Sequence, residues 1–197
     1  MSAKEKLLIL DLDETLVYGT ETPLTRSADF RVDPFYLYKR PFLDCFLNTC
    51  LQWFEVAIWT SSSPDYATAV VAEIFADPDV LAFMWASNRC TLAYNSELRE
   101  HYSRKTLKKV KRKGYPLESI IVIDDTPKKW EQSYGNLIRV SPFEGDETDD
   151  DLQRLLPYLN QLRGEKNIRI LEKRTWRYRI IDRSIQSDQN TDRKETC

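Results

Sequence analysis

The sequence predicts an α/β fold, a doubly wound (Rossmann-like) parallel sheet of about five strands. Apolar runs of strand length alternate along the chain with segments of helical periodicity, the order typical of parallel strands joined by helices. The first run, Leu7-Leu8-Ile9-Leu10, shows no polar alternation, as expected for a strand covered on both faces. A chain of 197 residues is long enough to bury a core, and we expect one domain.

The N-terminal half predicts a small β element beside the parallel sheet. Two alternating segments are separated by the turn pair Asp33-Pro34, which predicts a β-hairpin flap. Pro41 suits the first turn of a helix, where the N–H group that proline lacks is not needed. After the first strand, the expected elements are hairpin strands at 28–32 and 35–39, a helix at 41–53, a strand at 54–59, a helix at 64–75 and an edge strand at 83–86.

The C-terminal half continues the alternation of helices and strands. Gly114 favours the end of a helix, and Pro157 predicts a kink or a break in the last one. Beyond Trp176 the chain turns polar, so we expect a folded domain over 1–176 and a disordered tail over 177–197. The expected elements are a helix at 103–113, a strand at 119–123, a strand at 136–140 and a helix at 148–162.

The composition argues against a membrane-embedded protein and against a general polyanion binder. The net charge is −2, so a nucleic-acid partner is not indicated. No apolar run approaches the about 18 residues of a membrane span, and the N-terminus lacks a signal-peptide pattern. We therefore expect a cytoplasmic or nuclear protein without a membrane partner.

Polar side chains follow three of the predicted strands where each strand ends. The carboxyl ends of parallel strands share one edge of a sheet, so these side chains are expected to converge there. Converging carboxylates are what a hard cation such as Mg²⁺ needs, whereas hydroxyls and a nearby ammonium suit a phosphoryl group. The residues concerned are Asp11, Asp13, Asp124 and Asp125 and the hydroxyl cluster from Thr60 to Ser63, and the predicted helix before the strand at 119–123 adds Lys105.

These residues resemble the signatures of haloacid-dehalogenase-superfamily phosphotransferases, and in detail those of the small C-terminal-domain phosphatase branch (NLI-interacting-factor-like). The sequence Asp11-Leu12-Asp13-Glu14-Thr15 matches the DxDxT signature of the superfamily. The resemblance extends from about Lys6 to Leu162, with the motifs in the order typical of the branch. The other matching segments are Lys39-Arg40-Pro41, Trp59-Thr60-Ser61-Ser62, Lys105-Thr106-Leu107, Asp124-Asp125-Thr126-Pro127 and Leu155-Leu156-Pro157-Tyr158.

The resemblance implies a catalytic role for each acid. Asp11 is the expected nucleophile, which forms an aspartyl-phosphate, and Asp13 the expected general acid and base. A Mg²⁺ ion is expected on Asp11, on the main-chain carbonyl of Asp13 and on Asp125. Asp124 is expected to bind the metal through water or to hold Lys105.

The resemblance also implies how the phosphoryl group is bound. Thr60 is expected to donate a hydrogen bond to a phosphoryl oxygen, and Lys105 to neutralise the charge that grows in the transition state. Ser61 is a further candidate for binding phosphate. Arg89 is either a substrate-binding residue, by analogy with relatives, or a solvated loop arginine.

The spacing of the motifs leaves no room for a large cap domain over the site. An open site favours a phosphate on a macromolecule, so we expect a Mg²⁺-dependent phosphomonoesterase acting on protein phosphoserine or phosphothreonine. The alternatives are a nucleic-acid-end or small-molecule phosphatase on the same scaffold, and a non-catalytic binding module, against which the intact Asp11/Asp13 pair argues. Whether the short hairpin at 28–39 gives peptide specificity stays open.

Overall fold

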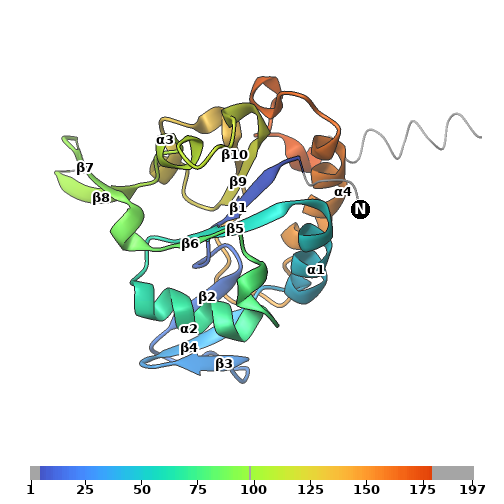
Figure 1. The fold of residues 1–197 in the computed structure, drawn as a ribbon. Coiled ribbons are helices and arrows are strands. Elements are labelled where there is room, and N and C mark those ends of the chain that lie inside the picture. The colour runs from blue at the N-terminus through green and yellow to red at the C-terminus, as the bar shows by residue number, and fades with distance from the viewer. Residues whose placement is uncertain (1–4, 98, 179–197) are drawn as a thin grey trace, which may run out of the picture.

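The structure, a computed structural model, describes residues 5–97 and 99–178 and confirms the predicted α/β fold. Its central sheet has five parallel strands in the order β10-β9-β1-β5-β6 (Figure 1). Residues 179–197, nearly all of the predicted tail, lie outside the described residues. The five strands coincide with predicted ones and are β1 (Leu7–Leu10), β5 (Glu55–Trp59), β6 (Met84–Trp85), β9 (Ile120–Asp124) and β10 (Leu137–Arg139).

Strand β1 lies at the centre of the sheet because it is apolar on both faces. All four of its residues are fully buried. Leu8 and Leu10 point into one core cluster and Leu7 and Ile9 into the other, as the alternation of a strand requires. Strand β1 pairs with β5 on one side and with β9 on the other, so the segments that follow these three strands emerge side by side.

Helices cover the two faces of the sheet unequally. The helices α1 (Leu43–Trp53), α2 (Pro64–Ile74) and α4 (Asp151–Arg163) pack into the core cluster of Leu8 and Leu10. The opposite face is covered by residues of the short helix α3 (Lys108–Lys111) and of 3-10 turns. Among the described helices, none combines the length and the apolarity needed to cross a membrane. The 3-10 turns are η1 (Pro78–Val80), η2 (Ser87–Arg89), η3 (Leu117–Ser119), η4 (Pro127–Trp130), η5 (Tyr134–Asn136) and η6 (Ile168–Ile170).

The structure corrects the predicted position of Pro41 and the break predicted at Pro157. Helix α1 begins at Leu43, and Phe42 just before it has a φ of 65°, so Pro41 precedes the helix instead of opening it. Helix α4 continues through Pro157 from its first residue to its last. Proline costs this helix one hydrogen bond, but the apolar face of α4 stays buried in the core and holds the helix in place.

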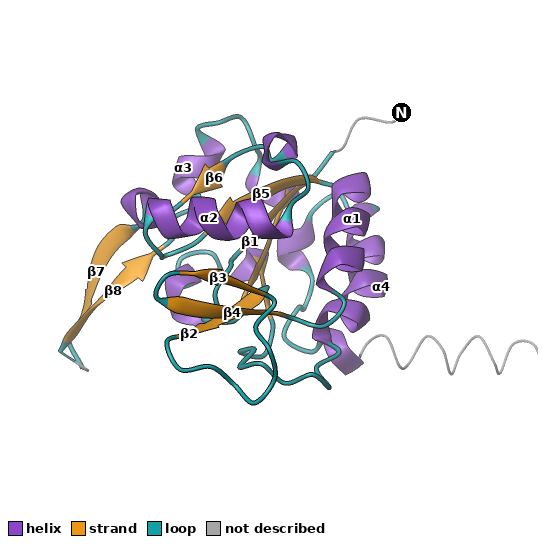
Figure 2. Cartoon of the chain, turned by 90° about the horizontal axis from the view of Figure 1, so that it is seen from below, coloured by secondary structure: helices purple, strands orange, loops and turns teal. Residues whose placement is uncertain are grey.

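The predicted helix at 103–113 is wrong over its first half. There, β8 (Glu100–Arg104) pairs antiparallel with β7 (Thr91–Asn95), and helix α3 starts only at Lys108. This hairpin projects from the domain beside β6 (Figures 1 and 2). Its side chains are exposed or half-buried, so it lacks the alternation of apolar residues by which a core strand is recognised in a sequence.

The predicted hairpin flap is confirmed and is part of a three-stranded sheet. Strands β2 (Val17–Thr20), β4 (Phe35–Lys39) and β3 (Phe30–Val32) pair antiparallel in the order β2-β4-β3 (Figure 2). The rings of Phe35 and of Tyr66 on α2 pack nearly perpendicular to each other, with their centres 5.7 Å apart. Within the described residues, this sheet and the β7–β8 hairpin are the β elements added to the central sheet, and no large cap domain is present there.

Candidate active site

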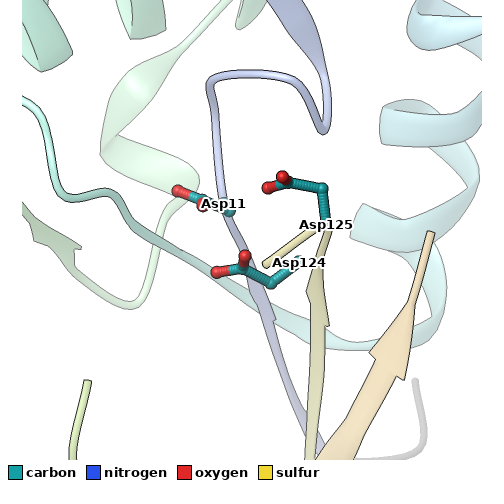
Figure 3. A group of neighbouring side chains, drawn as sticks. All are labelled: Asp11, Asp124 and Asp125. Atoms are coloured by element: carbon teal, nitrogen blue, oxygen red, sulfur yellow. The ribbon is translucent and has the colours of Figure 1, made fainter. Parts of the chain in front are cut away.

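Three buried aspartates converge at the carboxyl ends of β1 and β9. Asp11 follows β1, Asp124 ends β9 and Asp125 follows it, and each offers a carboxylate oxygen within 4.8 Å of the other two. Their side chains are grouped where the two strands end (Figure 3). Each of these three residues is at most 5% exposed. We call Asp11, Asp124 and Asp125 the acid cluster. The structure thus brings together three of the four acids that the sequence singles out.

Lys105 lies against the acid cluster, as predicted, but not on a helix. It directly follows β8, and its side chain is fully buried. Its Nζ lies 2.9 Å from Oδ1 of Asp11 and 2.7 Å from Oδ2 of Asp124. One ammonium group therefore bridges two carboxylates that would otherwise repel each other.

Lys129 is a second ammonium in the site, and the sequence analysis missed it. It lies on η4, four residues after Asp125, and its Nζ is 2.7 Å from Oδ2 of Asp11. The distances to Oδ1 of Asp124 and to Oδ1 of Asp125 are 3.6 Å and 3.8 Å. Lys128 is one residue nearer to the motif in sequence but pairs with Glu131, so residue type alone does not distinguish the two lysines.

The two lysines keep Asp11 ionised in a buried site. Burial by itself raises the pKa of Asp11, but the charges of Lys105 and Lys129 outweigh it and hold that pKa well below its usual range. Burial and the charge of Asp11 together raise the pKa of Asp124 to about 7. As the pH rises, Asp11 therefore loses its proton before Asp124 does.

Asp13 points away from the acid cluster toward hydroxyl groups. Its carboxylate accepts hydrogen bonds from Thr60 Oγ1 at 3.3 Å, Ser62 Oγ at 2.6 Å and Tyr66 OH at 2.7 Å. The carboxylate of Asp13 is thus not a member of the acid cluster, which leaves its main-chain carbonyl as the expected ligand. Ser62 belongs to the predicted hydroxyl cluster, whereas Tyr66 lies on α2 and carries no motif by which the sequence could single it out.

Thr60 and Thr15 hold the loops of the site in place. The buried Thr60 accepts a hydrogen bond from the main-chain N–H of Ser62 (3.0 Å), which closes the turn after β5. Thr15, the threonine of the DxDxT signature, donates to Oδ1 of Asp125 (3.4 Å) and accepts from the Asp125 N–H (3.2 Å). The hydroxyl of Thr15 therefore ties the loop after β1 to the end of β9.

The remaining two candidates lie beside β6. Ser61 Oγ is 4.0 Å from Cys90 Sγ, and the exposed guanidinium of Arg89 stacks on the ring of Trp85 at 4.7 Å. Within residues 5–97 and 99–178, neither side chain has a hydrogen bond or an ion pair with an acid of the site. Their roles in binding substrate stay predictions.

Comparison with known proteins identifies the family. Residues 6–169 match the family model of NLI interacting factor-like phosphatases. The chain belongs to this family. The match confirms the predicted family and phosphatase activity.

The relatives of this phosphatase include proteins named for the nuclear envelope. CTD nuclear envelope phosphatase 1 of Xenopus laevis is 29% identical over 193 residues, which cover 90% of this chain and 75% of that protein. Nuclear envelope morphology protein 1 of Saccharomyces cerevisiae is 27% identical over 184 residues, which cover 84% of this chain and 41% of that protein.

A solved structure confirms the fold. The fission yeast RNA polymerase II CTD phosphatase Fcp1-R271A bound to beryllium fluoride superposes with a TM-score of 0.57 at 22% identity. The superposition covers 81% of this chain and 50% of the Fcp1 chain. At this level of identity, the likeness concerns the α/β architecture.

Proposed function

We propose that this phosphatase removes phosphate from phosphoserine or phosphothreonine in proteins through an aspartyl-phosphate on Asp11. The observation that carries the proposal is the state of Asp11, a buried, ionised carboxylate at the end of a central strand, held by an ammonium on each oxygen. A carboxylate that is ionised and fixed in place is the form that attacks phosphorus.

The two acids of the DxD signature divide the chemistry between them. A carboxylate oxygen of Asp11 attacks the phosphorus, the ester bond to the serine or threonine oxygen breaks, and Asp13 gives that oxygen a proton. In the second step, Asp13 takes a proton from water, whose oxygen attacks the phosphorus and releases phosphate from Asp11. Lys105, fixed beside Asp11, balances the negative charge that grows on the phosphoryl oxygens.

The acid cluster fits a magnesium ion by the chemistry of its donors. Asp11, Asp124 and Asp125, together with the main-chain carbonyl of Asp13, would hold the ion with the oxygen ligands that Mg²⁺ prefers. When bound, the ion would screen the negative charge of the incoming phosphate from the carboxylates.

The substrate class rests on the open site and on the relatives. The described residues contain no large cap domain, so a phosphate on a protein surface is able to reach the edge of the sheet. Relatives named as CTD phosphatases support a phosphorylated protein as the partner. Relatives named for the nuclear envelope support a nuclear location.

A substrate panel tests this function. We expect phosphoserine and phosphothreonine peptides to show at least about tenfold higher kcat/KM than nucleotides, sugar phosphates and 3′- or 5′-phosphorylated oligonucleotides, with Mg²⁺ present. Phosphate release is the measurement, and activity without Mg²⁺ is the control for metal dependence. A higher kcat/KM for the phosphorylated oligonucleotides than for the peptides would contradict the proposal and would indicate a nucleic-acid-end phosphatase.

Tyr66→Phe tests the role of Asp13. The substitution removes one hydrogen bond from Asp13 and keeps the ring that packs on Phe35. We expect kcat to fall about three- to tenfold, the worth of one ordinary hydrogen bond, and KM to change little. Steady-state kinetics on a phosphopeptide measure both, with Tyr36→Phe on β4 as the matched control. A raised KM at unchanged kcat would assign Tyr66 to substrate binding instead.

A further inference from the structure

We propose that Lys129 is a built-in counter-ion of the metal position, which a divalent cation must displace in order to bind. The inference rests on the metal use in the proposed function and adds to it a residue that controls cation affinity. In the protein without a bound cation, the ammonium of Lys129 occupies the position that the cation occupies in the metal-bound protein.

The geometry places this ammonium where a cation would sit. Its Nζ faces all three members of the acid cluster, at 2.7 Å, 3.6 Å and 3.8 Å. Lys105, in contrast, contacts only Asp11 and Asp124 and approaches Asp11 at the other carboxylate oxygen, Oδ1. Lys129 is thus the ammonium that shares the ligands of the expected metal.

The charge balance favours replacement over simultaneous binding. With all three carboxylates ionised, the two ammonium groups leave the buried site with one net negative charge. A divalent cation in place of the Lys129 ammonium makes the site neutral. Cation and ammonium together would leave a net positive charge and would bring two like charges close together in a poorly solvated place.

The packing allows the side chain of Lys129 to leave, while its backbone stays. The carbonyl of Lys129 accepts a hydrogen bond from the Lys105 N–H at 2.8 Å, and its N–H donates to the Thr126 carbonyl at 3.2 Å. Trp130, next in the chain, is fully buried and donates from Nε1 to Asp124. The Lys129 side chain keeps 21% of its surface exposed, whereas that of Lys105 keeps none. Side-chain rotation into solvent is therefore open to Lys129 and closed to Lys105.

Two consequences follow from this exchange. The protein stays stable without a cation, because the acid cluster always has a partner. The apparent affinity for the cation is reduced, because each binding event must first break the Lys129 ion pairs.

Lys129→Met tests the exchange without supplying a new metal ligand. We expect Mn²⁺, followed by electron paramagnetic resonance in the absence of substrate, to bind at least about tenfold more tightly to this variant than to the wild type. Thermal unfolding should show a lower Tm without cation and a larger rise in Tm on adding Mg²⁺. Lys129→Arg, which keeps the charge, should bind Mn²⁺ as weakly as the wild type.

Lys128→Met is the matched control. It removes the same charge one residue away, from a side chain that is 48% exposed and pairs with Glu131. Its Mn²⁺ affinity should equal that of the wild type. A Lys129→Met variant that folds only with Mg²⁺ would support the inference, since Lys105 would then be the one ammonium left to balance three carboxylates.

Equal or weaker Mn²⁺ binding by Lys129→Met would overturn the inference. It would mean that the ammonium and the cation occupy different places. Because binding is measured without substrate, this result is distinct from a failure of the proposed function. That failure would show as a wild-type protein that binds Mn²⁺ but releases no phosphate from phosphopeptides.

Discussion

Asp11→Asn should abolish phosphate release from a phosphoserine peptide, with kcat lowered by at least about 10³-fold. The amide of asparagine has nearly the shape of the carboxylate but cannot form an acyl phosphate. Both ammonium groups beside Asp11 keep Asp124 as a partner, so the fold should persist. Phosphate release at saturating Mg²⁺ is the measurement, and circular dichroism checks the fold.

The matched control for this substitution is Asp44→Asn. Asp44 lies in the first turn of α1, with an exposed side chain that pairs with Lys39, and it is not a member of the acid cluster. Its removal should leave kcat within about twofold of the wild type. Equal activity of the wild type and Asp11→Asn would refute the assignment of the nucleophile.

Arg40→Met should destabilise the protein by about 3–5 kcal/mol. The Arg40 guanidinium is buried and makes two hydrogen bonds of 2.7 Å to Asp149, one of 3.0 Å to Asp151 and one of 3.1 Å to the carbonyl of Thr15. Methionine fills a similar volume but leaves Asp149 without this partner. Urea unfolding followed by fluorescence gives the difference in free energy.

The control for Arg40→Met is the same substitution at an exposed ion pair. Arg31 pairs with Asp33 at 3.0 Å, and both side chains are more than half exposed. Arg31→Met should cost no more than about 1 kcal/mol, since water solvates both partners once the pair is gone. Similar decreases in the free energy of unfolding of the two variants would mean that burial does not determine how much these ion pairs stabilise the protein.

The sequence was sufficient to predict the central sheet because its strands are continuously apolar. The runs that became β1, β5 and β9 are buried on both faces, and that burial is what continuous apolarity indicates. The β7–β8 hairpin could not be found in this way, because its strands contribute little to the core. The basic residues from Arg104 onward fit a solvated helix as well as a strand.

The site was predictable where chemistry depends on sequence spacing, and not where it depends on tertiary contact. Asp11, Asp124 and Asp125 stand at strand ends, so their convergence follows from the parallel sheet. Lys129 and Tyr66 reach the site only through the packing of η4 and α2. Neighbouring residues of similar type, such as Lys128, point elsewhere, and no local pattern separates them.

The pairing of β1 with β9 makes the site depend on long-range order. Asp11 meets Asp124 only when strands more than a hundred residues apart in sequence lie in register, Leu10 beside Ile123. A slip of one residue would turn side chains to the opposite face and separate the nucleophile from its partners. Contacts between such distant segments form slowly, because a large chain loop must close first. Recovery of phosphatase activity during refolding therefore reports the closure of the central sheet itself.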